Sequence, residues 1–119
     1  MKYKRNIQKM RITQGCMTDC VAYYFNLHPE KVPLFIYPRI GWSKRFKDFF
    51  KRRGFKVMWI KTNKAPKRGR YLVVGDSLIW KTASHMVVYK NGKIVYDPTY
   101  PSRWKDNRIT HYLKISKNK

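Results

Sequence analysis

Three residues of this chain have the types that nucleophilic catalysis requires: Cys16, His85 and Asp97. A thiol becomes a strong nucleophile when an imidazole takes its proton, and a carboxylate often orients that imidazole. His85 enters one apolar run and Asp97 leaves a second, with Asn91-Gly92 between them. Asn-Gly between two apolar runs is the strongest short signal for a β-hairpin. Because a hairpin brings its open ends together, we expect His85 and Asp97 to be neighbours.

The register of this hairpin decides whether the two side chains meet, since side chains alternate between the faces of a strand. A two-residue type I′ turn would pair Lys90 with Lys93 and leave Asp97 facing away from His85. A three-residue loop with a G1 bulge would pair Tyr89 with Lys93 and place His85 opposite Asp97. The chemistry needs the second register, or a distortion at the strand ends with the same effect. We therefore predict the bulged register.

The thiol is expected at the start of a helix. Cys16 follows Gly15, and the apolar residues after it recur at helical spacing, which predicts a helix over 16–27 that ends at His28-Pro29. Unpaired N–H groups and the positive end of the helix dipole favour a reactive thiolate at such a position. An oxyanion donor is expected from a glutamine upstream, and both Gln8 and Gln14 qualify by position.

Each of these residues alone has an ordinary structural explanation. A cysteine near a helix start is usually a small buried hydrophobe, and a histidine at a strand edge is usually solvated. Asp-Pro after a strand commonly opens a turn. The joint order along the chain is what favours a catalytic site.

The elements that must position these residues follow from the pattern of apolar residues. A second, amphipathic helix is predicted over about 43–53, with Ser43 as its N-cap and Gly54 as its stop. Three phenylalanines should face inward from it: Phe46, Phe49 and Phe50. Strands are predicted at 55–60, at 71–74 (ended by Gly75-Asp76), in the hairpin and at 109–115. Two helices followed by an antiparallel sheet make an α+β domain.

The length of 119 residues fits a single domain over 1–119. Residues 1–13 form a polar, basic segment that we expect to be a loop or short strand, and the tail 116–119 is expected to fray.

The charge balance is extreme, with 28 Lys and Arg against 6 Asp and Glu, a net +22. Such a surface attracts polyanions, so nucleic acid or an acidic protein is a candidate partner. The alternative is a compositional bias toward lysine with no specific ligand. No apolar run is long enough to cross a membrane.

The two cysteines, Cys16 and Cys20, are expected to be free thiols, because their spacing on a helix suits a disulfide poorly. Neither they nor the three histidines have metal-ligand spacing, so no metal and no cofactor is expected. No apolar signal segment follows the basic N-terminus. We therefore expect a cytoplasmic protein.

The order of these motifs resembles small papain-like cysteine hydrolases. The chain is similar to the leader-peptidase domains of bacteriocin exporters, and more so to short papain-like proteins of bacteria and their phages. The first block that carries the likeness is Cys16, Cys20-Val21-Ala22 and Val32-Pro33. The second block is His85-Met86-Val87-Val88, Asn91-Gly92, Asp97-Pro98 and Tyr100-Pro101-Ser102.

The resemblance leaves the nucleophile open between two cysteines. Exporter peptidases favour Asp-Cys-Gly with a Gln six residues earlier, which here fits Gln14 and Cys20, although Val21 replaces the glycine. We prefer Cys16, because a helix starting there has about three turns, whereas one starting at Cys20 is barely long enough to be stable. With Cys16, the oxyanion residue would be Gln8.

The resemblance implies a papain-like peptidase or amidase that forms an acyl-enzyme through Cys16, His85 and Asp97. Its substrate would be a peptide or protein, in the cytoplasm of a bacterial or phage-infected cell or in the virion. The alternative is a non-catalytic papain-like scaffold of phage or mobile-element origin that binds nucleic acid or an acidic partner.

Overall fold

The computed structural model describes residues 16–35, 40–76, 84–98 and 104–117. The predictions for Gln8, Gln14 and the segment 1–13 lie outside these residues. The helical elements are α1 (Cys16–Phe25), η2 (Pro29–Lys31), α2 (Trp42–Arg52) and η3 (Asp106–Arg108). The strands are β1 (Phe55–Lys61), β2 (Arg70–Asp76), β3 (Ser84–Lys90), β4 (Lys93–Tyr96) and β5 (Ile109–Lys117).

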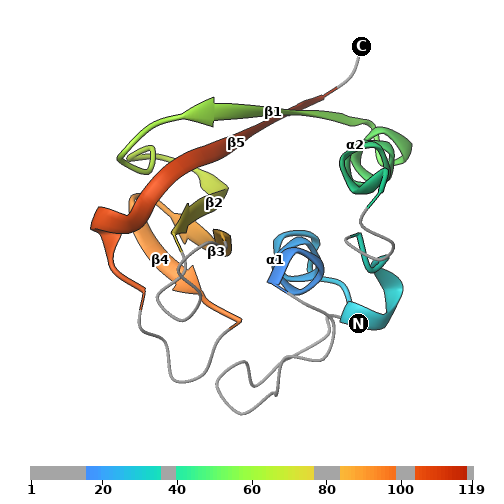
Figure 1. Ribbon diagram of the computed structural model, residues 1–119, viewed down its shortest axis with the longest axis horizontal. Coiled ribbons are helices and arrows are strands. Elements are labelled where there is room, and N and C mark those ends of the chain that lie inside the picture. The colour runs from blue at the N-terminus through green and yellow to red at the C-terminus, as the bar shows by residue number, and fades with distance from the viewer. Residues whose placement is uncertain (1–15, 36–39, 77–83, 99–103, 118–119) are drawn as a thin grey trace.

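The strands form one five-stranded sheet in the order β1-β5-β2-β3-β4, and every neighbouring pair is antiparallel. Both α-helices lie on the same side of the sheet, which curves around them (Figure 1). The predicted α+β class, with two helices before an antiparallel sheet, is confirmed. Among the described residues, no helix has both the length and the apolar character needed to span a bilayer.

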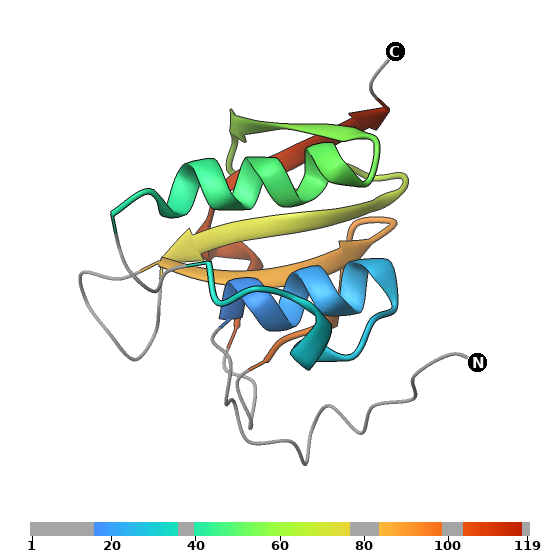
Figure 2. The same cartoon turned by 90° about the vertical axis from the view of Figure 1, so that its right-hand side faces the viewer.

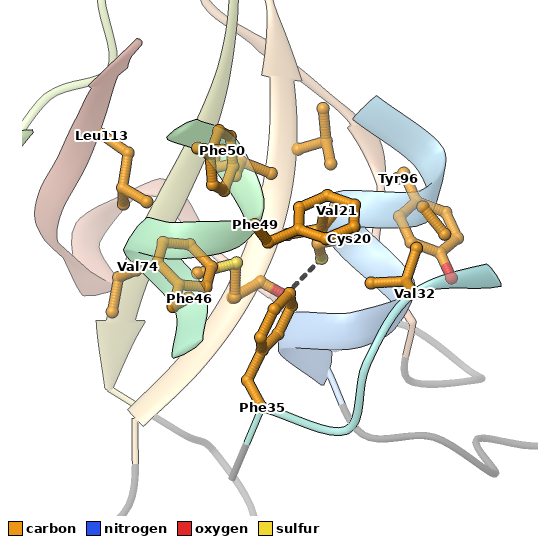
Figure 3. Close-up of a cluster of buried hydrophobic side chains, with 14 residues drawn as sticks. Cys20, Val21, Val32, Phe35, Phe46, Phe49, Phe50, Val74, Tyr96 and Leu113 are labelled. Atoms are coloured by element: carbon orange, nitrogen blue, oxygen red, sulfur yellow. Dashed lines mark hydrogen bonds between the residues drawn. The ribbon is translucent and has the colours of Figure 1, made fainter. Parts of the chain in front are cut away.

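The main core lies between the helices and the concave face of the sheet. Phe46, Phe49 and Phe50 of α2 are buried, as the sequence predicts, and they pack with Leu113 of β5 and Val21 of α1 (Figure 3). Each fully buried side chain of this size contributes about 1.5–3 kcal/mol. This aromatic layer fixes α2 and α1 against the sheet.

The first helix ends earlier than predicted, and for a different reason. Asn26 adopts a left-handed conformation with φ 58°. The amide of Leu27 bonds the carbonyl oxygen of Ala22 at 2.7 Å, and that of Asn26 bonds Tyr23 at 3.1 Å. These two bonds form a Schellman motif, which closes the helix before Pro29 is reached.

The second helix also differs at its start. Its N-cap is Gly41, with φ 81°, and no side chain caps it. The prediction of Ser43 as N-cap is therefore wrong, since Ser43 lies within the helix. Gly54 follows the helix end with φ 89°, and its amide bonds the Lys51 carbonyl oxygen at 3.0 Å, which confirms the predicted stop.

Two strands run further than the sequence indicated. β2 includes Gly75 and Asp76, because both pair with β3. β5 continues to Lys117, which pairs with Phe55, so the expected fraying does not begin at Ser116. The extra pairs give β1 a partner along its whole length.

Candidate active site

The β3–β4 hairpin has a different turn from the one predicted. Lys90 pairs with Lys93, and the two residues between them have positive φ, 52° at Asn91 and 81° at Gly92. This is the geometry of a two-residue type I′ turn. The prediction of a G1 bulge at the turn, with Tyr89 opposite Lys93, is wrong. Asn-Gly suits both turns, and the right-handed twist of the strands favours the primed type.

A β-bulge further along the hairpin shifts the pairing of β4 with β3 by one residue. Tyr89 pairs with Ile94, but Val88 pairs with Tyr96, so Val95 is an extra residue in β4. One extra residue moves every later side chain of that strand to the other face. Asp97 is thereby brought to the face of β3 that carries His85.

His85 and Asp97 form a buried pair. The distance from His85 Nε2 to Asp97 Oδ1 is 2.7 Å, and their side chains are 16% and 3% exposed. A short hydrogen bond between an imidazole and a carboxylate fixes the orientation of the ring. Because Nε2 is engaged by Asp97, Nδ1 is the ring nitrogen left for another partner.

Cys16 acts on the same imidazole, since a hydrogen bond with Cys16 and its charge are two of the causes that raise the pKa of His85. Burial lowers the pKa of His85, but the hydrogen bonds to Asp97 and Cys16 and the charges of these two groups raise it more. The resulting pKa is about 9, against an ordinary value of 6.5. The hydrogen bonds and charges of these partners therefore stabilise the protonated form of the imidazole.

Two contacts hold α1 against the hairpin at this point. Cys20 is fully buried, and its Sγ donates to the carbonyl oxygen of Met86, the residue after His85, at 3.1 Å (Figure 3). Tyr23 stacks on Tyr96, the residue before Asp97, with ring centroids 4.5 Å apart. The helix packs along β3 in this arrangement, with the half-buried Cys16 as its first residue (Figure 2).

Sequence reasoning missed Trp104, whose ring centroid lies 6.0 Å from that of His85. Trp104 Nε1 donates to the hydroxyl of Tyr89 at 2.7 Å, and that hydroxyl donates to Asp106. The ring lies over Gly75, where a Cβ atom would be 2.5 Å from Trp104 Cη2. A glycine inside a strand often marks such a close approach, and this was the available signal.

The structure thus brings Cys16, His85 and Asp97 together and places the rival Cys20 inside the core. Gln8 and Gln14 lie outside the described residues. No cluster of three or more His, Cys, Asp or Glu suited to a metal ion occurs in the part of the chain that the structure describes. The chain matches no protein-family model, no curated protein and no solved structure.

Proposed function

We propose that this protein is a papain-like cysteine hydrolase that cleaves a peptide or related amide bond. The observation that carries the proposal is the 2.7 Å hydrogen bond between His85 and Asp97, together with Cys16 placed close enough to raise the pKa of the same imidazole. The three residues come from α1, from β3 and from the position directly after β4, so they meet only in the folded chain. A thiol, an imidazole and an orienting carboxylate in this order are the parts of a nucleophilic triad.

The chemistry follows from the raised pKa of His85. A raised pKa makes the imidazole a stronger base, so His85 can take the proton of Cys16 as the sulfur attacks a carbonyl carbon. The imidazolium then gives its proton to the leaving amine, and a thioester remains on Cys16. Water attacks the thioester with His85 as the base, which releases the acid and restores the thiol.

The start of α1 supplies part of the electrostatic stabilisation. Backbone N–H groups in the first turn of a helix have no partner within the helix, and the dipole makes this end positive. The negative oxygen of a tetrahedral intermediate on Cys16 would develop beside them. Gln8 is our proposed side-chain donor to that oxygen, with Gln14 as the alternative.

Burial favours Cys16 over Cys20 as the nucleophile. Cys20 is 0% exposed and its sulfur is hydrogen-bonded to a backbone carbonyl, which leaves no path for a substrate. Cys16 is partly exposed and lies beside the imidazole. Cys20 instead fixes the helix that carries Cys16.

An acylation burst tests the proposal without a known substrate. The wild-type protein is mixed with p-nitrophenyl acetate, and nitrophenolate release is followed with intact-mass analysis. We expect a burst close to one equivalent of protein, with one acetyl group mapped to Cys16. Cys16→Ala and His85→Gln should abolish the burst, whereas the matched variant Cys20→Ala should keep it.

Two outcomes would contradict the proposal. A burst of equal size in Cys16→Ala would place the nucleophile elsewhere. No burst from a protein whose circular dichroism shows it folded would favour the alternative function, a non-catalytic basic scaffold that binds nucleic acid or an acidic partner.

A further inference from the structure

The convex face of the sheet carries an open basic area over β1, β5 and β2. In β1 the alternate residues Lys56 and Met58 belong to it, because Phe55, Val57 and Trp59 pack against the helix-side core. Met58 pairs with Lys114 of β5 and is 54% exposed. We call the following residues the open sheet face: Lys56, Met58, Tyr71, Tyr112 and Lys114.

Two tyrosines complete this face beside Lys114. Leu72 pairs with Leu113 and Val73 with Tyr112, a register that puts Tyr71 opposite Lys114. The half-buried rings of Tyr71 and Tyr112 meet edge to face, with centroids 5.3 Å apart. Lys114 therefore projects between a thioether and an aromatic ring.

The charged side chains of the open sheet face are all positive. Neither β1 nor β5 contains an acidic residue. Lys56 and Lys114 are both exposed, and Lys56 lies diagonally across from Lys114, a separation of about 7–8 Å. The loop between β1 and β2 adds three more exposed cations: Lys64, Lys67 and Arg68.

That loop is fixed to the sheet rather than free. The amide of Gly69 donates to the side-chain oxygen of Asn91, and the amide of Asn91 donates to the Gly69 carbonyl oxygen, both at 2.9 Å. Ala65, Tyr71 and Tyr112 all pack against a second, smaller buried cluster of Val73, Val87, Tyr89 and Ile109. These contacts anchor the end of the loop at the β3–β4 turn, where Lys67 lies next to Gly92.

We infer that the open sheet face binds single-stranded nucleic acid without strong sequence preference. Lys56 and Lys114 can neutralise phosphates of a bound strand. Met58 beside them, with the exposed parts of Tyr71 and Tyr112 beyond Lys114, offers apolar and aromatic surface for unstacked bases. A duplex keeps its bases stacked inside and would present its phosphates to this convex face, so its binding would not depend on Met58. None of these five residues has an amide, carboxylate or guanidinium group, planar groups that can make two hydrogen bonds with one base edge, so we expect low sequence specificity.

This surface lies on the opposite side of the sheet from α1 and α2 (Figure 1), and the inference does not depend on the proposed hydrolase activity. Cys16→Ala should therefore bind nucleic acid as the wild-type protein does.

The test measures the binding of a fluorescent oligothymidylate, and of its duplex with oligoadenylate, by anisotropy at several salt concentrations. Lys56→Glu with Lys114→Glu is compared with a matched pair, Lys47→Glu with Lys51→Glu, which makes the same change in net charge on the exposed side of α2. Circular dichroism checks that each variant is folded.

We expect the open-face pair to weaken single-strand binding about tenfold more than the α2 pair at moderate salt. It should also reduce the slope of log K against log salt by about 1.4, since each phosphate contact with a single strand contributes about 0.7. Met58→Ser should weaken single-strand binding and leave duplex binding unchanged.

Equal losses from the two charge pairs would show binding by overall charge and would overturn the inference. Tighter binding to the duplex, or to polyglutamate or anionic vesicles, than to the single strand would overturn it as well.

Discussion

Replacing Asp97 with asparagine removes a charge while keeping the shape of the side chain and its hydrogen-bonding oxygen. The pKa of His85 rises from 6.5 to about 9 although burial lowers it, and the hydrogen bond to Asp97 is the largest of the effects that raise it. A carboxylate at hydrogen-bond distance usually shifts a partner's pKa by about 1–3 pH units. We therefore expect the pKa of His85 in Asp97→Asn to fall by about that amount, into the neutral range.

The same shift has a consequence for stability. The rise from 6.5 to about 9 corresponds to about 3 kcal/mol in favour of the protonated imidazole in the folded state. Since the folded pKa is the higher one, this contribution is fully present below pH 6.5 and is lost as the pH rises through 9. The wild-type protein should lose more stability across this interval than Asp97→Asn does.

The assay is a pH titration of the His85 ring by NMR, with urea unfolding at the two ends of the interval. His28 and His111 in the same spectra report any general change in the protein. A wild-type pKa of His85 near 6.5, or an unchanged pKa in Asp97→Asn, would refute the reasoning. Either result would mean that Asp97 does not hold the proton on the imidazole.

Three further substitutions test the surroundings of the site by urea unfolding. Cys20→Ala removes a buried sulfur and its bond to Met86, so it should cost about 1–2 kcal/mol while Cys16 stays reactive; loss of that reactivity would contradict a structural role. Gly75→Ala places a Cβ atom against the Arg108 carbonyl oxygen and 2.5 Å from Trp104, so it should cost about 3 kcal/mol, and a neutral result would disprove the close packing. Tyr89→Phe leaves Trp104 Nε1 and Asp106 without their shared hydroxyl and should cost about 1–3 kcal/mol, with a change in tryptophan fluorescence; unchanged stability would argue against this network.

Local patterns in the sequence were sufficient to predict most of the helices and strands. Asn91-Gly92 predicted the hairpin, and the spacing of Phe46, Phe49 and Phe50 predicted the buried side of α2. The end of α1 was predicted too late. Pro29 is the more obvious helix terminator in the sequence, but Asn26 adopts a left-handed conformation and ends the helix before Pro29 is reached.

The contact between His85 and Asp97 was predicted from the sequence, but the β-bulge that produces it was not. The bulge at Val95 falls within a run of β-formers, Ile94-Val95-Tyr96, in which no glycine marks it. Its position depends on how β4 packs, including the stacking of Tyr96 on Tyr23 from α1. The approach of Trp104 to His85 likewise depends on chain segments distant in sequence, which local patterns do not report.

Site-resolved alkylation tests the central claim, the coupling of Cys16 to His85, most directly. The folded protein is treated with iodoacetamide at neutral pH for increasing times, quenched and mapped by peptide mass spectrometry. We predict rapid labelling of Cys16, labelling of Cys20 only after unfolding in denaturant, and much slower labelling of Cys16 in His85→Gln. Preferential labelling of Cys20 in the folded protein, or a Cys16 rate that His85→Gln leaves unchanged, would contradict the account.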